Sequence, residues 1–562
     1  MNLITLIKKN KYLSYKKSIL YILSFCICAF AQPAWVGFLG YFAYFFGYSL
    51  FFLSIFDIES KKKKFLLTFI WFFLNQAIWL SWFTTTKYQG PLILLVYFFV
   101  LVWFSLQFGV LSFFVSRSKN ISFFNILLIS SIWTIFEWSR LFFLCGFSFN
   151  QLGGLMGNNY IAMQLSSIVG IYGLSFFVIF LNLTVFKSII EKSKKTFILA
   201  IFLAMFPYVF GFIHIKTHEE KFKNSKKINA VLMQTSILPE QKNKFSKHLN
   251  EFIHPLEQWK RIMIYINQHK HKKIDMIVLP EAALPYHAND CFYPISIVKD
   301  LFKSMYGKNV VNYLDNIDEF YTEKYKDELY VSNNYFLKAL SLIFNAEIIA
   351  GLEDFENNKN YNAAFYFDPN VNRYLRYEKQ ILVPMGEYIP FDFLKKIAKE
   401  KYGIVGSFIN GNETKIFSNK NPLSISICYE ETFNEIMRKA RNKGAQIFVN
   451  ITNDAWFYKS KLFKQHFYHS RFRSVENGLS LIRASNNGIT GAIDPFGRII
   501  KSLSNENDRD ALFVSVPIFK YFTLYSFWGN SFIISISFSI ISLFIFKVFS
   551  KKIKLALKEI VS

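Results

Sequence analysis

The chain alternates long apolar runs with short basic clusters near both ends, and the region between them mixes apolar and polar residues as a soluble protein does. A helix needs about 20 apolar residues to cross the hydrocarbon core of a bilayer. About eight runs are long enough, and they lie near 17–31, 35–56, 65–84, 91–115, 122–142, 164–186, 196–214 and 523–546. The pattern predicts an α-helical polytopic membrane domain over 1–220 and a final transmembrane helix with a basic tail over 521–562.

Residues 225–520 show the alternation of strands and helices that is typical of an α/β layer fold. Buried strands are predicted at 274–279, 423–428 and 445–450, with further strands at 229–233, 347–351, 363–367 and 489–493. Helical patterns lie between them, for example at 245–269 and 465–477. The segment 286–340 is rich in Tyr, Lys, Asp and Asn and has no clear period.

The formal net charge of +26 does not indicate nucleic-acid binding, because many Lys and Arg residues stand at the ends of the apolar runs. Such residues set membrane topology through the positive-inside rule. They occupy alternate loops, and Lys87 is the main exception. This places both termini in the cytoplasm and the 225–520 domain on the opposite side, the periplasm of a Gram-negative cell. The clusters are Lys8, Lys9, Lys11, Lys16 and Lys17; Lys61 to Lys64; Arg117 and Lys119; Lys187, Lys192, Lys194 and Lys195; and Lys547, Lys551, Lys552, Lys554 and Lys558.

The N-terminus allows two interpretations. Its Lys residues, apolar stretch and Ala29-Phe30-Ala31 resemble a signal peptide with a cleavage site. A retained helix is favoured, because another apolar span follows at once. Five cysteines are too few for a disulfide framework. We expect Cys291 and Cys428, which lie in the extramembrane domain, to be free.

Three short segments, far apart in the extramembrane region, carry the candidate chemistry. They are Val278-Leu279-Pro280-Glu281-Ala282, Tyr377-Glu378-Lys379-Gln380-Ile381-Leu382-Val383-Pro384 and Ser426-Ile427-Cys428-Tyr429-Glu430. They supply a carboxylate, an ammonium and a thiol, which suffice as base, charge stabiliser and nucleophile for covalent acyl transfer. Alone, each residue has a simpler explanation: Cys428 as a packed thiol, Glu281 as a loop acid and Lys379 as a surface lysine.

Together these segments resemble the signature of the nitrilase-like, or carbon–nitrogen hydrolase, superfamily. A membrane domain that encloses such a module before the last helix is similar to its membrane branch, the apolipoprotein N-acyltransferase family. The resemblance extends over nearly the whole chain. Further matching segments are Asn453-Asp454-Ala455-Trp456-Phe457, Gln465-His466, Arg483-Ala484-Ser485-Asn486-Asn487-Gly488, Pro495-Phe496-Gly497, Trp133, Glu137-Trp138, Gly146-Phe147 with Asn150, and Gly170-Ile171-Tyr172-Gly173 with Ser175.

The resemblance implies an αββα sandwich and a two-step transfer through a thioester, without a cofactor or a metal. Cys428 would be the nucleophile, Glu281 the general base and Lys379 the oxyanion stabiliser. The acyl donor would be a membrane phospholipid, and the acceptor the N-terminal amine of a diacylglyceryl-cysteine in an apolipoprotein. The membrane is the further partner, and we expect no nucleic-acid ligand and a monomer.

Five further residues receive supporting roles from the same resemblance. Glu387 would orient Lys379 or Glu281, and Tyr429, through its backbone N–H, would help to hold the oxyanion, with Glu430 beside it. Trp456 and Phe457 would form either a membrane-facing flap or a buried aromatic pair. In the membrane domain, Glu137 and Arg140 either pair at the interface or extend toward it.

Some positions depart from the family pattern, and other functions stay open. Ser148-Phe149 and Met385 differ from it, Gln234-Thr235-Ser236-Ile237-Leu238-Pro239 matches loosely, and the stretch between Glu281 and Leu340 is longer than expected. One alternative is a membrane-anchored amidase that uses the same three residues, although anchoring needs only one span. The other is a transporter or scaffold with a degenerate module, which predicts the loss of at least one of the three.

Overall fold

The computed structural model describes residues 3–561 except 116, 117, 119, 243–250, 391–406, 419, 504, 506 and 507. The chain divides into two compact units. The helical unit comprises Met1–Thr217, Ser460–Tyr468 and Thr523–Ser562, and the sandwich unit comprises His218–Lys459 and His469–Phe522. Residues 460–468, which lie inside the predicted extramembrane segment, therefore group with the helices.

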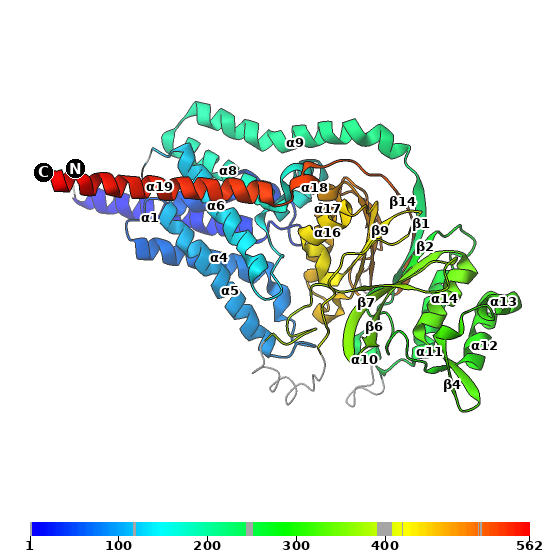
Figure 1. Ribbon diagram of the computed structural model, residues 1–562. Coiled ribbons are helices and arrows are strands. Elements are labelled where there is room, and N and C mark those ends of the chain that lie inside the picture. Colours follow the sequence, from blue (N-terminus) through cyan, green and yellow to red (C-terminus); the bar gives the residue numbers. More distant parts are fainter. Residues whose placement is uncertain are drawn as a thin grey trace. The chain divides into compact units, whose positions relative to one another are not determined.

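Helices of very different length build the helical unit (Figure 1). Four of them are long and apolar enough to cross a membrane among the described residues, over Leu92–Phe114, Ser166–Glu191, Lys194–Lys223 and Ser531–Leu555. The other predicted spans correspond to α1, to the consecutive run α2–η1–α3, to α4, which begins inside the Lys61–Lys64 cluster, and to α6, which has 17 residues. The elements are α1 (Leu3–Ala29), α2 (Leu39–Phe42), the π-helix η1 (Ala43–Gly47), α3 (Tyr48–Ile55), α4 (Lys61–Trp79), η2 (Ser81–Thr84), α5 (Leu92–Leu111), η3 (Ser112–Phe114), α6 (Phe123–Ser139), η4 (Arg140–Phe142), η5 (Leu152–Asn158), α7 (Tyr160–Met163), α8 (Ser166–Glu191), α9 (Lys194–Lys223), α18 (Leu524–Trp528) and α19 (Ser531–Val561).

Buried amide groups join the helices of this unit. The Asn182 side chain of α8 donates to the Tyr44 carbonyl at 2.8 Å and accepts from the Ser49 backbone N–H at 3.0 Å. A π-helix has a different hydrogen-bond spacing from an α-helix, and a polar side chain can satisfy the carbonyls that this leaves. The helical unit is thus held by polar contacts to backbone as well as by aromatic packing, as between Phe72 and Phe108, whose ring centroids are 3.8 Å apart.

Helix α8 contains a kink that requires glycine. Gly170 has a φ of +66° inside the helix, and a Cβ atom there would collide with the ring of Tyr525 in α18. An L-residue is strained at this φ whatever the space. The sequence motif at 170–173 therefore has a packing explanation within the helical unit.

The alternative that Glu137 and Arg140 extend away from the helices is wrong, whereas their pairing at the interface stays a prediction. Both side chains are buried, with exposed fractions of 4% and 2%. Glu137 accepts from the Trp133 ring N–H at 2.9 Å and the Leu152 N–H at 3.0 Å, whereas Arg140 makes long contacts to Gln107 and Asn150. Residues 143–152, which lie between two predicted spans, fold back and supply Asn150 and Leu152 as partners.

Short helices and strands alternate along the sandwich unit. The elements are β1 (Lys227–Gln234), α10 (Pro239–Lys242), α11 (Pro255–Asn267), β2 (Met276–Val278), β3 (Tyr293–Pro294), α12 (Ile295–Tyr306), η7 (Lys308–Val310), α13 (Val311–Leu314), η8 (Glu319–Tyr321), β4 (Thr322–Tyr325), β5 (Glu328–Val331), α14 (Asn333–Phe344), β6 (Glu347–Glu356), β7 (Lys359–Phe367), β8 (Leu375–Glu378), β9 (Leu423–Ile427), η9 (Cys428–Thr432), α16 (Asn434–Asn442), β10 (Ile447–Thr452), η10 (Asp454–Phe457), α17 (Leu462–Asn477), β11 (Ser480–Ser485), β12 (Gly491–Ile493), β13 (Ile499–Ser502) and β14 (Asp510–Pro517).

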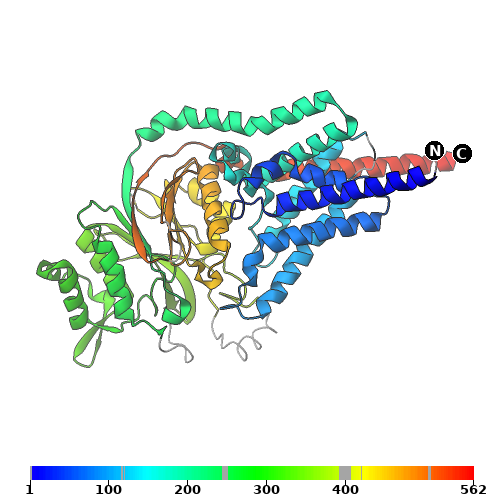
Figure 2. The same ribbon diagram turned by 180° about the vertical axis from the view of Figure 1, so that it is seen from behind.

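Two sheets form the centre of the sandwich unit, with helices outside each (Figures 1 and 2). The six-stranded sheet has the order β14-β1-β2-β6-β7-β8 and the five-stranded sheet the order β13-β12-β11-β10-β9. One core cluster takes apolar side chains from both sheets, such as Val278 of β2 and Val449 of β10. The two sheets therefore pack face to face.

A second core cluster lies on the other face of the six-stranded sheet, against helices. It joins side chains of β1 and β6 to those of α11, α12 and α14, with Trp259 and Phe336 stacked at 4.5 Å between ring centroids. Helices α16 and α17 lie outside the five-stranded sheet (Figure 1). The sandwich unit is therefore a helix–sheet–sheet–helix arrangement, the αββα order that the family resemblance implied.

The predicted strands and helices have close counterparts, with shifted ends. The predicted helix over 245–269 is shorter in its described part, since α11 begins at Pro255, and residues 243–250 lie outside the described residues. The segment 286–340, which showed no period, folds into helices and the three-stranded sheet β3-β5-β4.

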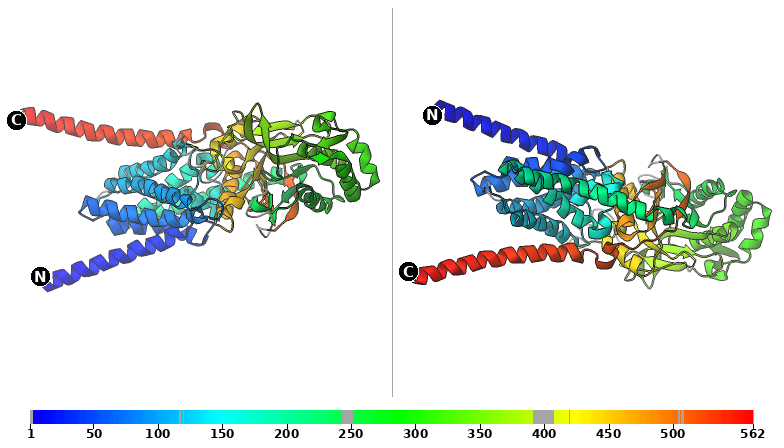
Figure 3. Two further views of the ribbon diagram at one scale, coloured as in Figure 1. Left: turned by 90° about the horizontal axis from the view of Figure 1, so that it is seen from below. Right: turned by 90° about the horizontal axis from the view of Figure 1, so that it is seen from above.

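The first and last helices run to the same end of the helical unit. Helix α1 begins, and helix α19 ends, at the same end of this unit (Figure 3). All five cysteines are free, as expected for Cys291 and Cys428.

Candidate active site

Cys428 stands where a buried strand turns sharply into a short helix. Strand β9 is buried throughout and ends at Ile427, and the 3-10 helix η9 begins at Cys428 itself. Cys428 has a φ of +53°, a left-handed conformation that is uncommon for a residue other than glycine. Such backbone outliers concentrate at functional sites. The turn lifts the thiol out of the sheet, and the side chain is partly exposed.

Glu281 leaves the neighbouring sheet in a similar way. It follows β2 and Pro280, its exposed fraction is 5%, and the next residue, Ala282, has a φ of +47°. Strand β6 passes very close: a Cβ atom on Gly351 would lie 2.5 Å from the Glu281 Cα. A glycine at 351 is therefore needed for Glu281 to occupy its position.

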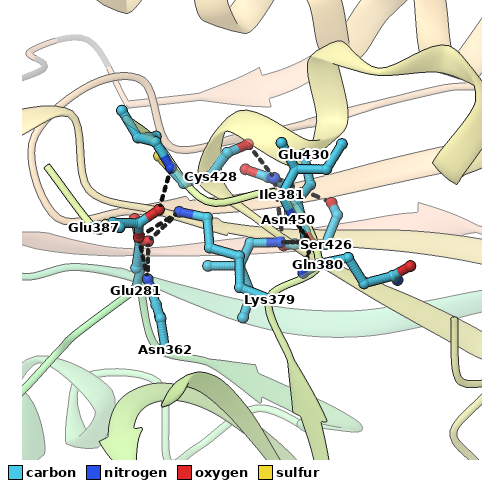
Figure 4. A network of polar contacts seen from close by, with 12 residues as sticks. Glu281, Asn362, Lys379, Gln380, Ile381, Glu387, Ser426, Cys428, Glu430 and Asn450 are labelled. Carbon is cyan, nitrogen blue, oxygen red and sulfur yellow. Dashed lines mark hydrogen bonds and ion pairs between the residues drawn. The ribbon is translucent and has the colours of Figure 1, made fainter. Parts of the chain in front are cut away.

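Lys379 lies between two carboxylates, as Figure 4 shows. Its ammonium donates to Glu281 Oε1 at 3.0 Å and to Glu387 Oε1 at 2.8 Å, and only 1% of the residue is exposed. Lys379 follows β8 and donates its own N–H to the Asn362 carbonyl at 2.9 Å. The structure thus brings together Glu281, Lys379 and Glu387, although Glu281 is distant from the other two in the sequence.

Asn362 completes this group and was missed by the sequence analysis. Its amide nitrogen donates to Glu281 Oε1 and to Glu387 Oε1, both at 2.7 Å. Glu387 also accepts from the Val383 N–H at 2.8 Å. Asn362 lies inside β7, where it begins the buried part of the strand and directly precedes the apolar run 363–367, and this was the available signal. Carboxylates can bind metal cations, but those of Glu281 and Glu387 are already bound by Lys379 and Asn362.

The charges of this group act on the thiol and on the ammonium. Burial alone would lower the pKa of Lys379, but the charges of Glu281 and Glu387 outweigh it and hold that pKa well above its usual range. Burial, and next the charge of Glu281, raises the pKa of the Cys428 thiol, while Lys379 opposes this rise. The resting thiol is therefore protonated, and it needs a base to become a nucleophile.

Glu430 links the segment of Cys428 to the segment of Lys379. It is fully buried and accepts from the Ile427 N–H at 2.7 Å and the Tyr377 hydroxyl at 2.9 Å. It also accepts from the backbone N–H groups of Gln380 and Ile381. Burial raises the pKa of Glu430 to about 7. This carboxyl therefore fixes the backbone before Cys428 to the backbone after Lys379.

The remaining predicted residues surround the same turn. Tyr429 is largely buried, and its ring meets that of Phe433 edge to face at 4.9 Å. Asn450, which was also missed, donates to the Cys428 carbonyl at 3.3 Å and to the Ser426 hydroxyl at 3.1 Å. Both contacts of Asn450 fix the end of β9 where the chain turns.

Trp456 and Phe457 lie in η10, which follows β10. Trp456 is 45% exposed, and Phe457 is half-buried. The alternative of a buried aromatic pair is therefore wrong for Trp456. An exposed indole can contact a lipid or another ligand.

Two departures from the family pattern have structural counterparts. Met385 has a φ of +65° in the tight turn where its N–H donates to the Tyr388 carbonyl at 2.7 Å. After the loosely matching segment 234–239, Lys242 donates to the Ala282 carbonyl at 2.6 Å, directly after Glu281. These segments therefore shape the surroundings of Glu281 and Glu387.

Comparisons with known proteins identify related families. Residues 254–543 match the family model "Carbon-nitrogen hydrolase", and residues 19–184 match "Apolipoprotein N-acyltransferase N-terminal domain". The chain is 28% identical over 547 residues to an apolipoprotein N-acyltransferase of Chlamydia pneumoniae, covering 93% of this chain and 96% of the relative. It is 30% identical over 411 residues to one of Rickettsia prowazekii, covering 70% and 72%. Among solved structures it is similar to Saccharomyces cerevisiae Nit3, a member of the nitrilase superfamily, with 17% identity, a TM-score of 0.35 and coverage of 54% and 93%.

Proposed function

The chain belongs to the apolipoprotein N-acyltransferase family, within the carbon–nitrogen hydrolases, and we propose accordingly that it acylates the N-terminal amine of diacylglyceryl-cysteine in apolipoproteins. The acyl donor is a membrane phospholipid. The observation that carries this proposal is the buried Lys379, hydrogen-bonded to Glu281 and Glu387 in the unit that presents Cys428 on a strained turn.

In the first step, Glu281 takes the thiol proton of Cys428. The thiolate attacks the ester carbonyl of the phospholipid, and a tetrahedral oxyanion forms. Lys379 and the backbone N–H of Tyr429 stabilise this charge. The oxyanion collapses to a thioester on Cys428, and the lysophospholipid leaves as an alcohol after it receives the proton from Glu281.

In the second step, the amine of the acceptor attacks the thioester. Glu281 takes a proton from this amine, and the thiol leaves with a proton returned to it. The products are the N-acylated lipoprotein and the free enzyme, which predicts ping-pong kinetics. Glu387 and Glu430 act by orientation: Glu387 holds Lys379, and Glu430 holds the turn of Cys428.

The membrane location follows from the same proposal. Both substrates carry long acyl chains, so the reaction belongs at a bilayer surface. About eight transmembrane helices, over residues 1–220 and 521–562, would place both termini in the cytoplasm and residues 225–520 in the periplasm of a bacterial inner membrane. The beginning of α1 and the end of α19 at one end of the helical unit support this topology. Trp456 would serve as a flap toward the lipid, and the enzyme would be a monomer.

The test is intact-mass spectrometry of the purified protein after incubation with phospholipid alone. Wild type should gain the mass of a fatty acyl group that hydroxylamine removes, and Cys428→Ala should gain none. An unmodified wild-type protein with a reduced Cys428 would contradict the phospholipid donor. It would favour an amidase that releases an acid from a small amide.

A further inference from the structure

Glu431, the residue after Glu430, places a second buried carboxylate on the opposite side of the Cys428 turn. Glu431 is fully buried and forms an ion pair with Arg483 of β11. Its other oxygen accepts from the Ser470 hydroxyl of α17 at 2.9 Å. Whereas Glu430 joins the turn of Cys428 to the segment of Lys379, Glu431 joins this turn to β11.

Arg483 has a second partner in the turn that carries Trp456. Its other terminal nitrogen donates to Asp454 Oδ2 at 3.1 Å, and the exposed fractions of Arg483 and Asp454 are 0% and 2%. Asp454 is the first residue of η10, two positions before the exposed Trp456. One planar guanidinium thus contacts the turn of the nucleophile and the turn of the predicted flap.

Close contacts and hydrogen bonds surround Asp454. The Asp454 N–H donates to the Asn487 carbonyl at 3.2 Å. Gly488 has a φ of +117°, and a Cβ atom there would lie 2.7 Å from Asp454 Oδ2. The neighbouring Asn453 accepts from the Asn486 amide at 2.9 Å. The base of the Trp456 turn therefore cannot shift without moving the carboxylate that Arg483 holds.

We propose that Arg483 is a positioning residue that couples the Trp456 turn to the Cys428 turn, so that the nucleophile reaches its reactive position only when the Trp456 turn is in place. This inference rests on the proposed function, because it assigns the coupling to acyl transfer. A buried guanidinium with two carboxylate partners suits this role: its fork fixes both partners in one plane, which a lysine ammonium cannot do.

The first experiment measures the rate of acyl-enzyme formation in micelles of dodecyl maltoside and dioleoyl phosphatidylethanolamine. The variants are Arg483→Lys, Glu431→Gln and Asp454→Asn, each checked for folding by thermal unfolding. Each should slow the step about tenfold or more, because small displacements of reacting groups reduce the rate strongly. Arg441→Lys is the matched control, since Arg441 is a buried arginine that binds the backbone carbonyls of Asn477 and Tyr521. It should stay within about twofold of wild type.

The second experiment separates coupling from a merely structural role. If Glu431 and Asp454 act through the same arginine, the double variant Glu431→Gln/Asp454→Asn should be no slower than the slower single variant. Independent effects, which multiply in the double variant, would overturn the proposal. Folded single variants that all react at about the wild-type rate would overturn it as well. If Arg483→Lys does not fold, the two carboxyl variants decide alone.

A lipid-free arm distinguishes this inference from the proposed function. Alkylation of Cys428 by iodoacetamide, followed by peptide mass spectrometry, reports the reactivity of the thiol without any phospholipid. The same non-additive pattern is expected there. A wild type without an acyl adduct contradicts the proposed function, whereas an adduct with additive variants contradicts only the coupling.

Discussion

The two units treat buried polar groups differently. In the helical unit, buried side chains such as Asn182 and Lys64 mostly bind backbone carbonyls, and Glu137 and Arg140 are each bound to neutral groups. In the sandwich unit, the buried charges around the Cys428 turn meet opposite charges, as in Lys379 with Glu281 and Arg483 with Glu431. A buried charge is costly unless it is paired. The proposed reaction therefore uses charges that are paired within the sandwich unit, while the polar contacts named in the helical unit join its helices.

Among the substitutions that test this difference between the units, Lys379→Met should have the largest effect on rate and stability. It leaves Glu281 and Glu387 buried without their cation, and it removes the proposed oxyanion stabiliser. We expect acyl-enzyme formation to fall by about 10³-fold or more and the free energy of unfolding to fall by about 3–5 kcal/mol. Mass spectrometry and thermal unfolding measure the two.

Lys338→Met is the matched control for this prediction. Lys338 is also buried, but it donates to the backbone carbonyls of Asp368, Pro369 and Val371. It should lose stability and keep its acylation rate once folded. Equal losses of rate in both variants would show that the charge of Lys379 has no special part in the reaction.

Gly351→Ala should separate geometry from charge. The added methyl group would lie 2.5 Å from the Glu281 Cα and displace the proposed base without changing any charge. We expect about 10²-fold slower acylation. Gly386→Ala adds the same methyl group at 3.7 Å from its nearest neighbour and should change the rate little. A Gly351→Ala enzyme of normal rate would mean that the position of Glu281 is not limiting.

The pH dependence of the free energy of unfolding tests Glu430, a buried carboxyl of the sandwich unit whose hydrogen bonds come from neutral groups. The pKa of Glu430 is raised to about 7 in the folded protein. The contribution of this carboxyl to the free energy of unfolding is therefore fully present below its unfolded pKa and is lost as the pH rises through about 7. A shift of this size corresponds to about 3 kcal/mol. The stability of wild type relative to Glu430→Gln should therefore fall between about pH 4.5 and about pH 7, as thermal unfolding over this range would show. Parallel curves for the two proteins would contradict it.

The smallest effect is expected in the helical unit. Asn182→Ala removes hydrogen bonds to Tyr44 and Ser49 and should lower the free energy of unfolding by about 1–3 kcal/mol. The acylation rate of the folded enzyme should remain close to that of wild type. A large loss of rate at unchanged stability would show that the polar contacts of the helical unit take part in the chemistry.

Much of the fold could be predicted because it depends on local patterns. The apolar runs predicted the helical unit, and short apolar segments predicted strands such as β2 and β9, to within a few residues. In the segment 286–340, the apolar residues of α12 recur at helical spacing and could have predicted that helix, whereas the short strands β4 and β5 are mostly exposed and carry no such pattern.

The order of residues alone established which chemical groups are present and that strands carry Glu281 and Cys428 to their ends. The fold was needed to show how those groups are held: the positive φ of Cys428, the amide of Asn362 between two carboxylates, and the opposite directions of Glu430 and Glu431. The physical reason is the separation along the chain of the residues that interact. Hydrophobic periodicity is a property of neighbouring residues, whereas the pairing of buried charges depends on residues that the fold brings together from distant positions.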